Sequence, residues 1–189
     1  MERIGIYGGS FNPPHIGHLI IANEVREQLK LDEVRFMPNN IPPHKAKTST
    51  SNQERYDMLN LAIGTNPYFS IDTIEWERSG ASYTIDTIKL LKERDVDTEI
   101  YFIIGADMIE YLPKWKQIDE LIQLVRFIGV KRPGYSTETS FPVALVDIPE
   151  IAVSSSWVRK KISDGKTIKY LVPDAVKLYI EENRLYGSE

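Results

Sequence analysis

The chain has no cysteine among its 189 residues, which excludes disulfides, thiolate catalysis and thiolate metal sites. It has no apolar run long enough to span a bilayer, and its charged start, MERIGIYGG, lacks the apolar core of a signal peptide. It also lacks a basic surplus, because 23 Lys and Arg stand against 27 Asp and Glu. We therefore expect a cytoplasmic protein with no membrane partner and no nucleic-acid partner.

What is present is the composition of an ordinary globular chain, with 42% hydrophobic and 26% charged residues. The length predicts a single domain over residues 1–189. Apolar segments alternate with amphipathic ones, and the segment 39–52 is a candidate mobile loop. Strands are predicted at 3–8, 33–38, 68–77, 99–105 and 141–149, helices at 18–30, 53–64, 82–95, 154–165 and 173–187, and a helix running into a strand at 119–132.

The strand sequences indicate how these elements are arranged. IGIY and IYFIIG are apolar throughout, as strands are when helices cover both faces of a parallel sheet. Alternation of such strands with helices predicts a doubly wound, Rossmann-like α/β fold with helices on both faces. In these folds ligands bind beyond the carboxyl ends of the strands, where the glycine-bearing motifs of this chain fall.

The first of these motifs is GGSFNPPHIGHL, residues 8–19. Gly8 and Gly9 allow a sharp turn and a close approach to a ligand, and the helix that opens near Gly17 points its positive end at the same place. His15 and His18 are three residues apart, so both rings can face one phosphate group. An ordinary glycine turn with a histidine cap is the plainer alternative, and a metal site lacks a third nearby ligand.

This motif resembles the Gly-x-Phe-x-Pro-x-His-x-Gly-His signature of the nucleotidyltransferase superfamily and implies its HxGH fold. The resemblance implies that Gly8, Gly9, Ser10, Phe11 and Gly17 bind ATP, and that His15 and His18 are catalytic. Class I aminoacyl-tRNA synthetases share the HIGH core, but they are far longer and carry a Lys-Met-Ser-Lys-Ser loop that is not found here.

Two further segments resemble nucleotide-binding parts of the superfamily. SSSWVR is similar to a Ser-Ser-Thr-x-Ile-Arg segment that holds pyrophosphate, which implies roles for Ser154, Ser155 and Arg159. A capped helix with a solvated basic face is the alternative. FIIGADM follows a predicted strand, and in the family an acidic residue at the position of Asp107, after Gly105, binds the adenosine ribose. Asp107 can also be a helix cap.

IPPHK, SYTIDT and LPKW narrow the resemblance to the bacterial nicotinate mononucleotide adenylyltransferases. By this resemblance, His44 and Lys45 lie near the phosphate of the mononucleotide, and Tyr83, Thr84 and Trp115 lie on the side of the nicotinate ring. The alternative for Trp115 is a core or surface aromatic, and for Lys45 a solvated loop cation.

The reaction implied is ATP plus nicotinate mononucleotide giving deamido-NAD and pyrophosphate, a step of NAD biosynthesis. A phosphate is already an anionic nucleophile, so positioning and charge stabilisation by His15, His18 and Arg159 suffice. Mg²⁺ is expected on the ATP phosphates and water, with no metal site built by the protein. Another phosphate acceptor, such as phosphopantetheine or nicotinamide mononucleotide, and a non-catalytic nucleotide-binding module stay open, as does a homo-oligomer such as a dimer.

Overall fold

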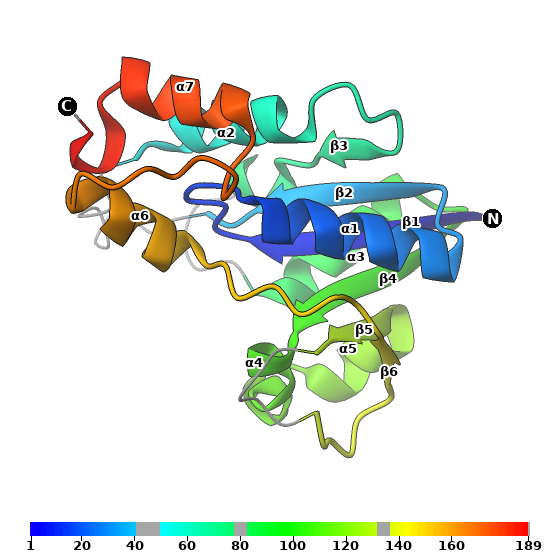
Figure 1. Cartoon of the computed structure of the whole chain (residues 1–189). Helices are drawn as coiled ribbons and strands as arrows, with labels where there is room; N and C mark the ends of the chain where they lie inside the picture. The colour runs from blue at the N-terminus through cyan, green and yellow to red at the C-terminus, as the bar shows by residue number, and fades with distance from the viewer. Residues whose placement is uncertain (41–49, 78–82, 132–136, 189) are drawn as a thin grey trace.

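The computed structural model describes residues 1–40, 50–77, 83–131 and 137–188. In these ranges six strands, all parallel to their neighbours, form one sheet in the order β3-β2-β1-β4-β5-β6 (Figure 1). This is the strand order of a doubly wound α/β fold, so the predicted fold class is confirmed. The strands are β1 (Glu2–Gly9), β2 (Glu33–Pro38), β3 (Phe69–Ile71), β4 (Thr98–Gly105), β5 (Arg126–Val130) and β6 (Val143–Val146).

Helices connect the strands and cover the sheet, with α1 crossing in front of it in Figure 1. The α-helices are α1 (Ile16–Leu29), α2 (Asn52–Ile63), α3 (Thr84–Arg94), α4 (Ala106–Ile109), α5 (Ile118–Leu124), α6 (Ser155–Ser163) and α7 (Asp174–Glu182). Short 3₁₀ turns are η2 (Ile74–Glu77), η3 (Leu112–Lys114) and η4 (Leu185–Gly187). No helix within the described ranges has the length and apolar content needed to cross a membrane.

The central strands bury both of their faces, as their sequences predict. Ile6 of β1 and Phe102 of β4 pack on one face with residues of α3 and α5. Tyr7 and Ile103, each the next residue along, pack on the other face with residues of α1. Since successive side chains of a strand point to opposite faces, an uninterrupted apolar run is what two helical layers require.

A third apolar cluster joins the C-terminal part of the chain to α2. Met58 of α2 packs with Val158 of α6, Val176 of α7 and Tyr186 of η4, all of them buried. Helices α2 and α7 accordingly lie side by side in Figure 1. The last residues are thereby held close to the segment that follows residue 49.

The predicted strand at 68–77 is wrong over its second half. β3 ends at Ile71, and the chain then turns into η2. The Asp72 side chain accepts a hydrogen bond from the Ile74 N–H at 3.2 Å, which competes with continued strand pairing. The alternation of SIDTIEW therefore reflects a turn followed by a 3₁₀ helix, and it places Glu75 toward the interior of the protein.

The segment 39–52, predicted to be a mobile loop, is described only at its two ends. Residues 41–49 lie outside the described ranges. Ser51 caps α2, because its side chain accepts a hydrogen bond from the Glu54 N–H and the Glu54 carboxylate accepts one from the Ser51 N–H at 2.6 Å. The end of the predicted loop is therefore a helix start.

Candidate active site

A cavity of about 490 Å³ lies at the carboxyl ends of the central strands. It opens beside β1 and β4, the neighbours at which the strand order reverses, where doubly wound folds bind their ligands. From the first motif it is lined by Gly8, Gly9, Ser10, His15, Gly17 and His18. From the other predicted segments it is lined by Thr84, Gly105, Asp107 and Trp115.

The turn after β1 is made by Phe11, a predicted ATP-binding residue that does not itself line the cavity. Gly8 and Gly9 belong to the strand, and neither has a left-handed backbone. Phe11 does, with φ at 45°, and its ring is 1% exposed. Gly9 is needed for another reason, because a Cβ there would lie 3.0 Å from the Phe11 ring. The predicted glycine turn is therefore wrong, and the buried Phe11 ring fixes the loop instead.

His15 and His18 are held as a stacked pair at the start of α1. His15 is the N-cap residue, and the ring centroids lie 3.6 Å apart with planes 23° from parallel. The His15 backbone N–H donates to Nδ1 of His18 at 3.0 Å. Since Nδ1 accepts this bond, the neutral His18 ring carries its proton on Nε2, and the tautomer that remains is a hydrogen-bond donor.

Neighbouring groups leave the two rings little freedom. The Phe11 ring meets His18 edge-on at 5.0 Å between centroids. Gly17 lies directly against His15, because a Cβ on Gly17 would come within 3.0 Å of Nδ1 and 3.1 Å of Cε1. The glycine of the His-x-Gly-His motif is therefore a steric requirement of the histidine ring within a helix, independent of any left-handed backbone.

The helix end contributes less to anion binding than the sequence argument assumed. The Ile16 N–H donates to the Leu171 carbonyl at 2.9 Å, and the His18 N–H donates to the His15 carbonyl at 3.0 Å. Two early N–H groups of α1 are thus engaged within the protein. The positive end of the helix dipole and the two histidine side chains remain as features that favour an anion there.

Asn12, between Phe11 and Pro13 of the signature loop, joins three segments beside the cavity. Its Oδ1 accepts hydrogen bonds from the Thr50 hydroxyl at 2.7 Å and from the Tyr186 hydroxyl. Its carbonyl accepts from Nη1 of Arg159 at 2.7 Å. Burial raises the pKa of Tyr186, so this hydroxyl stays a donor. The signature loop is therefore fixed by residues from the middle and the end of the chain.

The predicted pyrophosphate residues lie beside the signature loop and do not line the cavity. Ser154 is the N-cap of α6 and accepts from the Trp157 N–H at 3.2 Å. The Ser155 hydroxyl donates to the Pro13 carbonyl at 2.9 Å, next to the bond from Arg159 to Asn12. The capped-helix alternative thus describes Ser154, whereas Ser155 and Arg159 contact the loop that bears the histidines.

The side of the cavity away from α1 holds the other predicted residues. Thr84 is the first residue of α3, and Trp115 packs edge-on against Phe102 at 6.1 Å. Asp107 folds back over Gly105, so closely that a Cβ on the glycine would lie 2.5 Å from the carboxylate. Tyr83 is the N-cap of α3 and is exposed, with Lys116 over its ring. It does not line the cavity.

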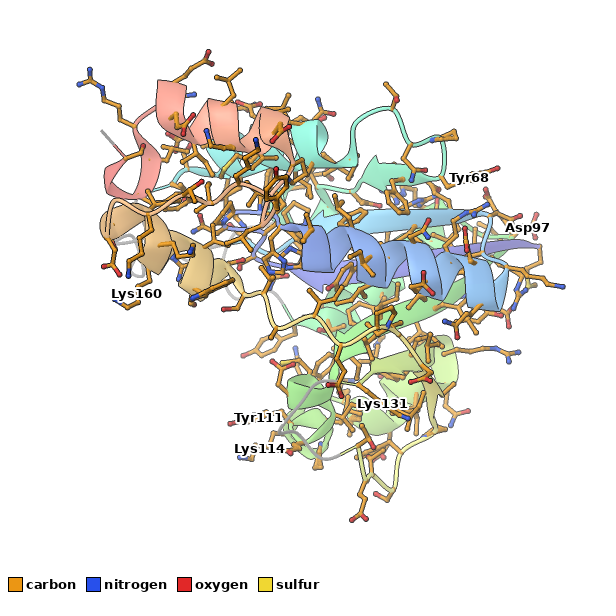
Figure 2. All side chains as sticks on the ribbon, viewed as in Figure 1. Tyr68, Asp97, Tyr111, Lys114, Lys131 and Lys160 are labelled. Carbon is orange, nitrogen blue, oxygen red and sulfur yellow. The ribbon has the colours of Figure 1, made fainter. Side chains whose placement is uncertain are left out.

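Several residues of the site were missed by sequence reasoning, and two that were named cannot be placed. His44 and Lys45 lie outside the described residues. Asn39 lines the cavity directly after β2, and its position after a predicted strand was an available signal. Met37, Glu75, Met108 and Lys131, the last labelled in Figure 2, also line it and had no distinguishing signal.

Comparison with known proteins assigns the family. A family model described as cytidylyltransferase-like matches residues 6–161. The chain is 54% identical to nicotinate-nucleotide adenylyltransferase of Bacillus subtilis (strain 168), covering 100% of both proteins. It is 57% identical to a protein of Geobacillus thermodenitrificans (strain NG80-2) named probable nicotinate-nucleotide adenylyltransferase, covering 100% of this chain and 88% of that protein.

A solved structure shares the fold at much lower identity. Plasmodium falciparum nicotinic acid mononucleotide adenylyltransferase, complexed with NaAD, superposes with a TM-score of 0.86 at 24% identity, covering 100% of this chain and 99% of that one. At this identity the likeness concerns the fold, which agrees with the strand order observed. Taken with the full-length identities, the chain belongs to the nicotinate-nucleotide adenylyltransferase family of cytidylyltransferase-like enzymes.

Proposed function

We propose that the protein transfers the adenylyl group of ATP to nicotinate mononucleotide, giving deamido-NAD and pyrophosphate. The observation that carries this proposal is the stacked histidine pair, which lines the cavity together with Thr84 and Trp115 from the opposite side. One end of the cavity therefore offers donors for phosphates, and the other offers an aromatic ring and a helix start for the acceptor.

The histidines would act on the phosphates that are exchanged. In an in-line displacement, the phosphate of the mononucleotide attacks the α-phosphorus of ATP, and the bond to the leaving pyrophosphate breaks. Negative charge is redistributed over the oxygens as this happens, so a donor fixed in advance lowers the barrier without reorganisation. Nε2–H of His18 is such a donor, because the capping bond and the Phe11 contact fix its ring.

The leaving pyrophosphate would be bound by Arg159, Ser155 and Ser154. Arg159 uses one nitrogen on Asn12 and another near the Ser156 hydroxyl, at 3.2 Å. A guanidinium has five N–H donors, so these contacts leave capacity for phosphate oxygens. Its bond to the signature loop would set its distance from His18.

Mg²⁺ is proposed to arrive with ATP, coordinated by the triphosphate and water, and when bound it would offset part of the phosphate charge. Two carboxylates, Glu75 and Asp107, line the cavity, and no group of three His, Asp or Glu gathers in the described ranges. We further propose one nucleotidyltransferase domain over residues 1–189 and a cytoplasmic location. A homo-oligomer stays a prediction.

Hydrogen-bond donors at the start of α3 would select the carboxylate of nicotinate over the amide of nicotinamide. The positive end of the α3 dipole and the Thr84 hydroxyl favour a carboxylate. The amide NH₂ would instead face donors, and each buried group left unpaired costs roughly 1–3 kcal/mol. One or two such mismatches, together about 1–6 kcal/mol, give a preference of roughly fivefold to 10⁴-fold.

The test measures pyrophosphate release with ATP, Mg²⁺ and a panel of nicotinate mononucleotide, nicotinamide mononucleotide and phosphopantetheine. We expect nicotinate mononucleotide to have the highest kcat/KM. Trp115→Ala should weaken the binding of both mononucleotides alike, because stacking does not distinguish acid from amide. Thr84→Val should instead bring the kcat/KM values of the two mononucleotides closer together. Equal kcat/KM for the two mononucleotides in the wild-type enzyme would overturn the nicotinate assignment.

A further inference from the structure

Two charged side chains are buried next to the cavity although neither belongs to a motif of the family resemblance. Arg55 of α2 is 0% exposed and Glu75 of η2 is 7% exposed. Burial of a charge is costly unless hydrogen bonds or an opposite charge compensate it. The groups that these two side chains contact therefore indicate which parts of the site the two charges hold in place.

Arg55 is compensated by neutral oxygens. Its Nη1 donates to the Ser10 carbonyl at 2.9 Å, and its Nη2 donates to the Asn39 carbonyl at 2.8 Å and to Oδ1 of Asn52 at 2.7 Å. In the part of the chain that the structure describes, no carboxylate pairs with it within 4.0 Å. Burial lowers the pKa of Arg55, but a guanidinium remains protonated in proteins.

Glu75 reaches the same peptide group from its other side. The peptide that joins Asn39 to Asn40 accepts from Arg55 through its carbonyl, and its N–H donates to Oε2 of Glu75 at 3.4 Å. The cation and the carboxylate are thus linked through one polarised peptide. Trp76, next to Glu75, has its ring 5.5 Å from the Arg55 guanidinium and covers it.

The segments that this pair connects surround the cavity. Ser10 follows β1 and Asn39 follows β2, and both line it, as Glu75 does. The other oxygen of Glu75 lies 3.4 Å from the hydroxyl of Thr87, on the first turns of α3. The pair therefore links the ends of two strands to the helix that begins at Thr84, the side of the cavity opposite the histidines.

We propose that Arg55 and Glu75 are positioning residues that fix the acceptor side of this site through the peptide they share. The proposal rests on the proposed function, since it concerns the mononucleotide that accepts the adenylyl group. Arg55 fixes the carbonyl of that peptide and Glu75 its N–H, so loss of either lets Asn39 and the start of α3 move relative to the phosphate end. Misplacement by about 1 Å costs up to roughly 100-fold in a site of this kind.

The test compares Glu75→Gln, Arg55→Met and the double variant Arg55→Met/Glu75→Gln with wild type. Measured are kcat, the KM for nicotinate mononucleotide, the KM for ATP, and Tm. Glu75→Gln removes the negative charge and replaces one of the two acceptor oxygens with a donor, so it should raise the KM for nicotinate mononucleotide roughly tenfold and leave the KM for ATP within about twofold. Arg55→Met should do the same and also lower kcat, because it releases Ser10. The double variant should lose less than the product of the single losses.

Arg35→Met and Asp72→Asn are the matched controls. Arg35 lies on β2 itself, Asp72 is as buried as Glu75, and neither lines the cavity. They should lower Tm without raising the KM for nicotinate mononucleotide, since asparagine keeps an oxygen for the Ile74 N–H that begins η2. Arg55→Lys keeps the charge but lacks the planar fork that bonds Ser10 and Asn39 from two nitrogens, so it should retain activity only in part.

Two results would overturn the proposal: an unchanged acceptor KM in Glu75→Gln, or single losses that multiply in the double variant. If Arg55→Met does not fold, Glu75→Gln alone decides, judged against Asp72→Asn. Failure of the proposed function looks different, because wild-type enzyme would then not adenylate nicotinate mononucleotide. The KM comparison would in that case be made with whichever acceptor the panel identifies.

Discussion

The two ends of the sheet hold their charged residues in different ways. At the amino end, where β2 and β4 begin, Arg35 and Arg94 contact carboxylates directly, with Asp95 at 2.5 Å from Arg35 and 3.1 Å from Arg94. Beyond the carboxyl end of β2, Arg55 contacts neutral oxygens, and its link to Glu75 runs through a peptide group. In Figure 2, Asp97 marks the first end, and Lys160 lies toward the second.

This difference indicates that the charged residues at the amino end act mainly in stability, and those at the carboxyl end mainly in function. Direct ion pairs at the amino end satisfy each other, so they contribute to folding and offer a ligand little. At the carboxyl end the side chains instead fix backbone groups and a histidine ring around the cavity, as Arg55 does at Ser10 and Asn39 and the His15 N–H does at His18. Changes at the carboxyl end should therefore alter turnover more than Tm, and changes at the amino end should do the reverse.

The largest expected effect comes from His18→Ala. It removes a donor that acts most strongly in the transition state, so kcat should fall roughly 100- to 1000-fold with a smaller rise in the KM for ATP. The variant also loses the bond from the His15 N–H to Nδ1, a helix cap of about 0.5–2 kcal/mol. Steady-state kinetics and thermal unfolding of the purified variant measure the two effects separately.

His18→Gln is the control for the cap. A glutamine at the third helical position can accept the His15 N–H, as in a capping box, but it cannot place its amide where Nε2 lies. Tm should return toward the wild-type value while kcat stays low. Near wild-type turnover in a folded His18→Ala enzyme would remove the central role given to this motif.

Gly17→Ala should lower kcat without lowering the stability of the fold. Alanine favours a helix over glycine by about 0.8–1.0 kcal/mol, so α1 itself gains from the change. The new methyl would lie 3.0 Å from the His15 ring and displace it from the stack on His18. We expect kcat to fall at least roughly tenfold with Tm unchanged or slightly higher. A fully active variant would show that the stacked arrangement is not required.

The sheet and the meeting of residues from the first motif at one cavity could be predicted from sequence, because their signals are local. A run such as IYFIIG is typical of a strand between two helical layers, and residues 8–19 hold the strand end, the helix start and both histidines within one contiguous motif. The glycines were recognised for the wrong reason. They make room for the rings of Phe11 and His15, which is a matter of side-chain packing that no backbone rule expresses.

The acceptor side was predicted only in part, because its residues meet across long distances in the sequence. Arg55 lies in a polar-looking helix start, and nothing local shows that it reaches Ser10, 45 residues earlier. Glu75 lay in a segment read as a strand with a polar face. Tyr186 reaches Asn12 across 174 residues, and such a contact is fixed by tertiary packing alone. Strand-end positions such as Asn39 were the one signal available.

The smallest effect is expected at the amino end, from Asp95→Asn. Burial raises the pKa of the Asp95 carboxyl, but hydrogen bonds from Arg94 and Arg35 outweigh it, so the pKa lies below its ordinary value of 3.8. A carboxyl whose pKa is lowered by folding stabilises the protein above that ordinary value, and it loses this contribution as pH falls through the lowered one.

Solvent partly screens these pairs, so Asp95→Asn should cost only about 0.5–1 kcal/mol at pH 7, or a Tm lower by about 1–4 °C. The Tm difference from wild type should begin to shrink as pH falls below the ordinary value of 3.8, because the carboxyl of the unfolded chain then takes up a proton. It should go on shrinking until pH passes through the lowered pKa of the folded protein. Turnover at pH 7 should not change, since Asp95 does not line the cavity. Thermal unfolding from pH 7 to pH 3 measures the first expectation, and kinetics at pH 7 the second. If kcat of Asp95→Asn at pH 7 were clearly lower than that of the wild type, the amino end of the sheet would affect function as well as stability, and the contrast between the two ends would be wrong.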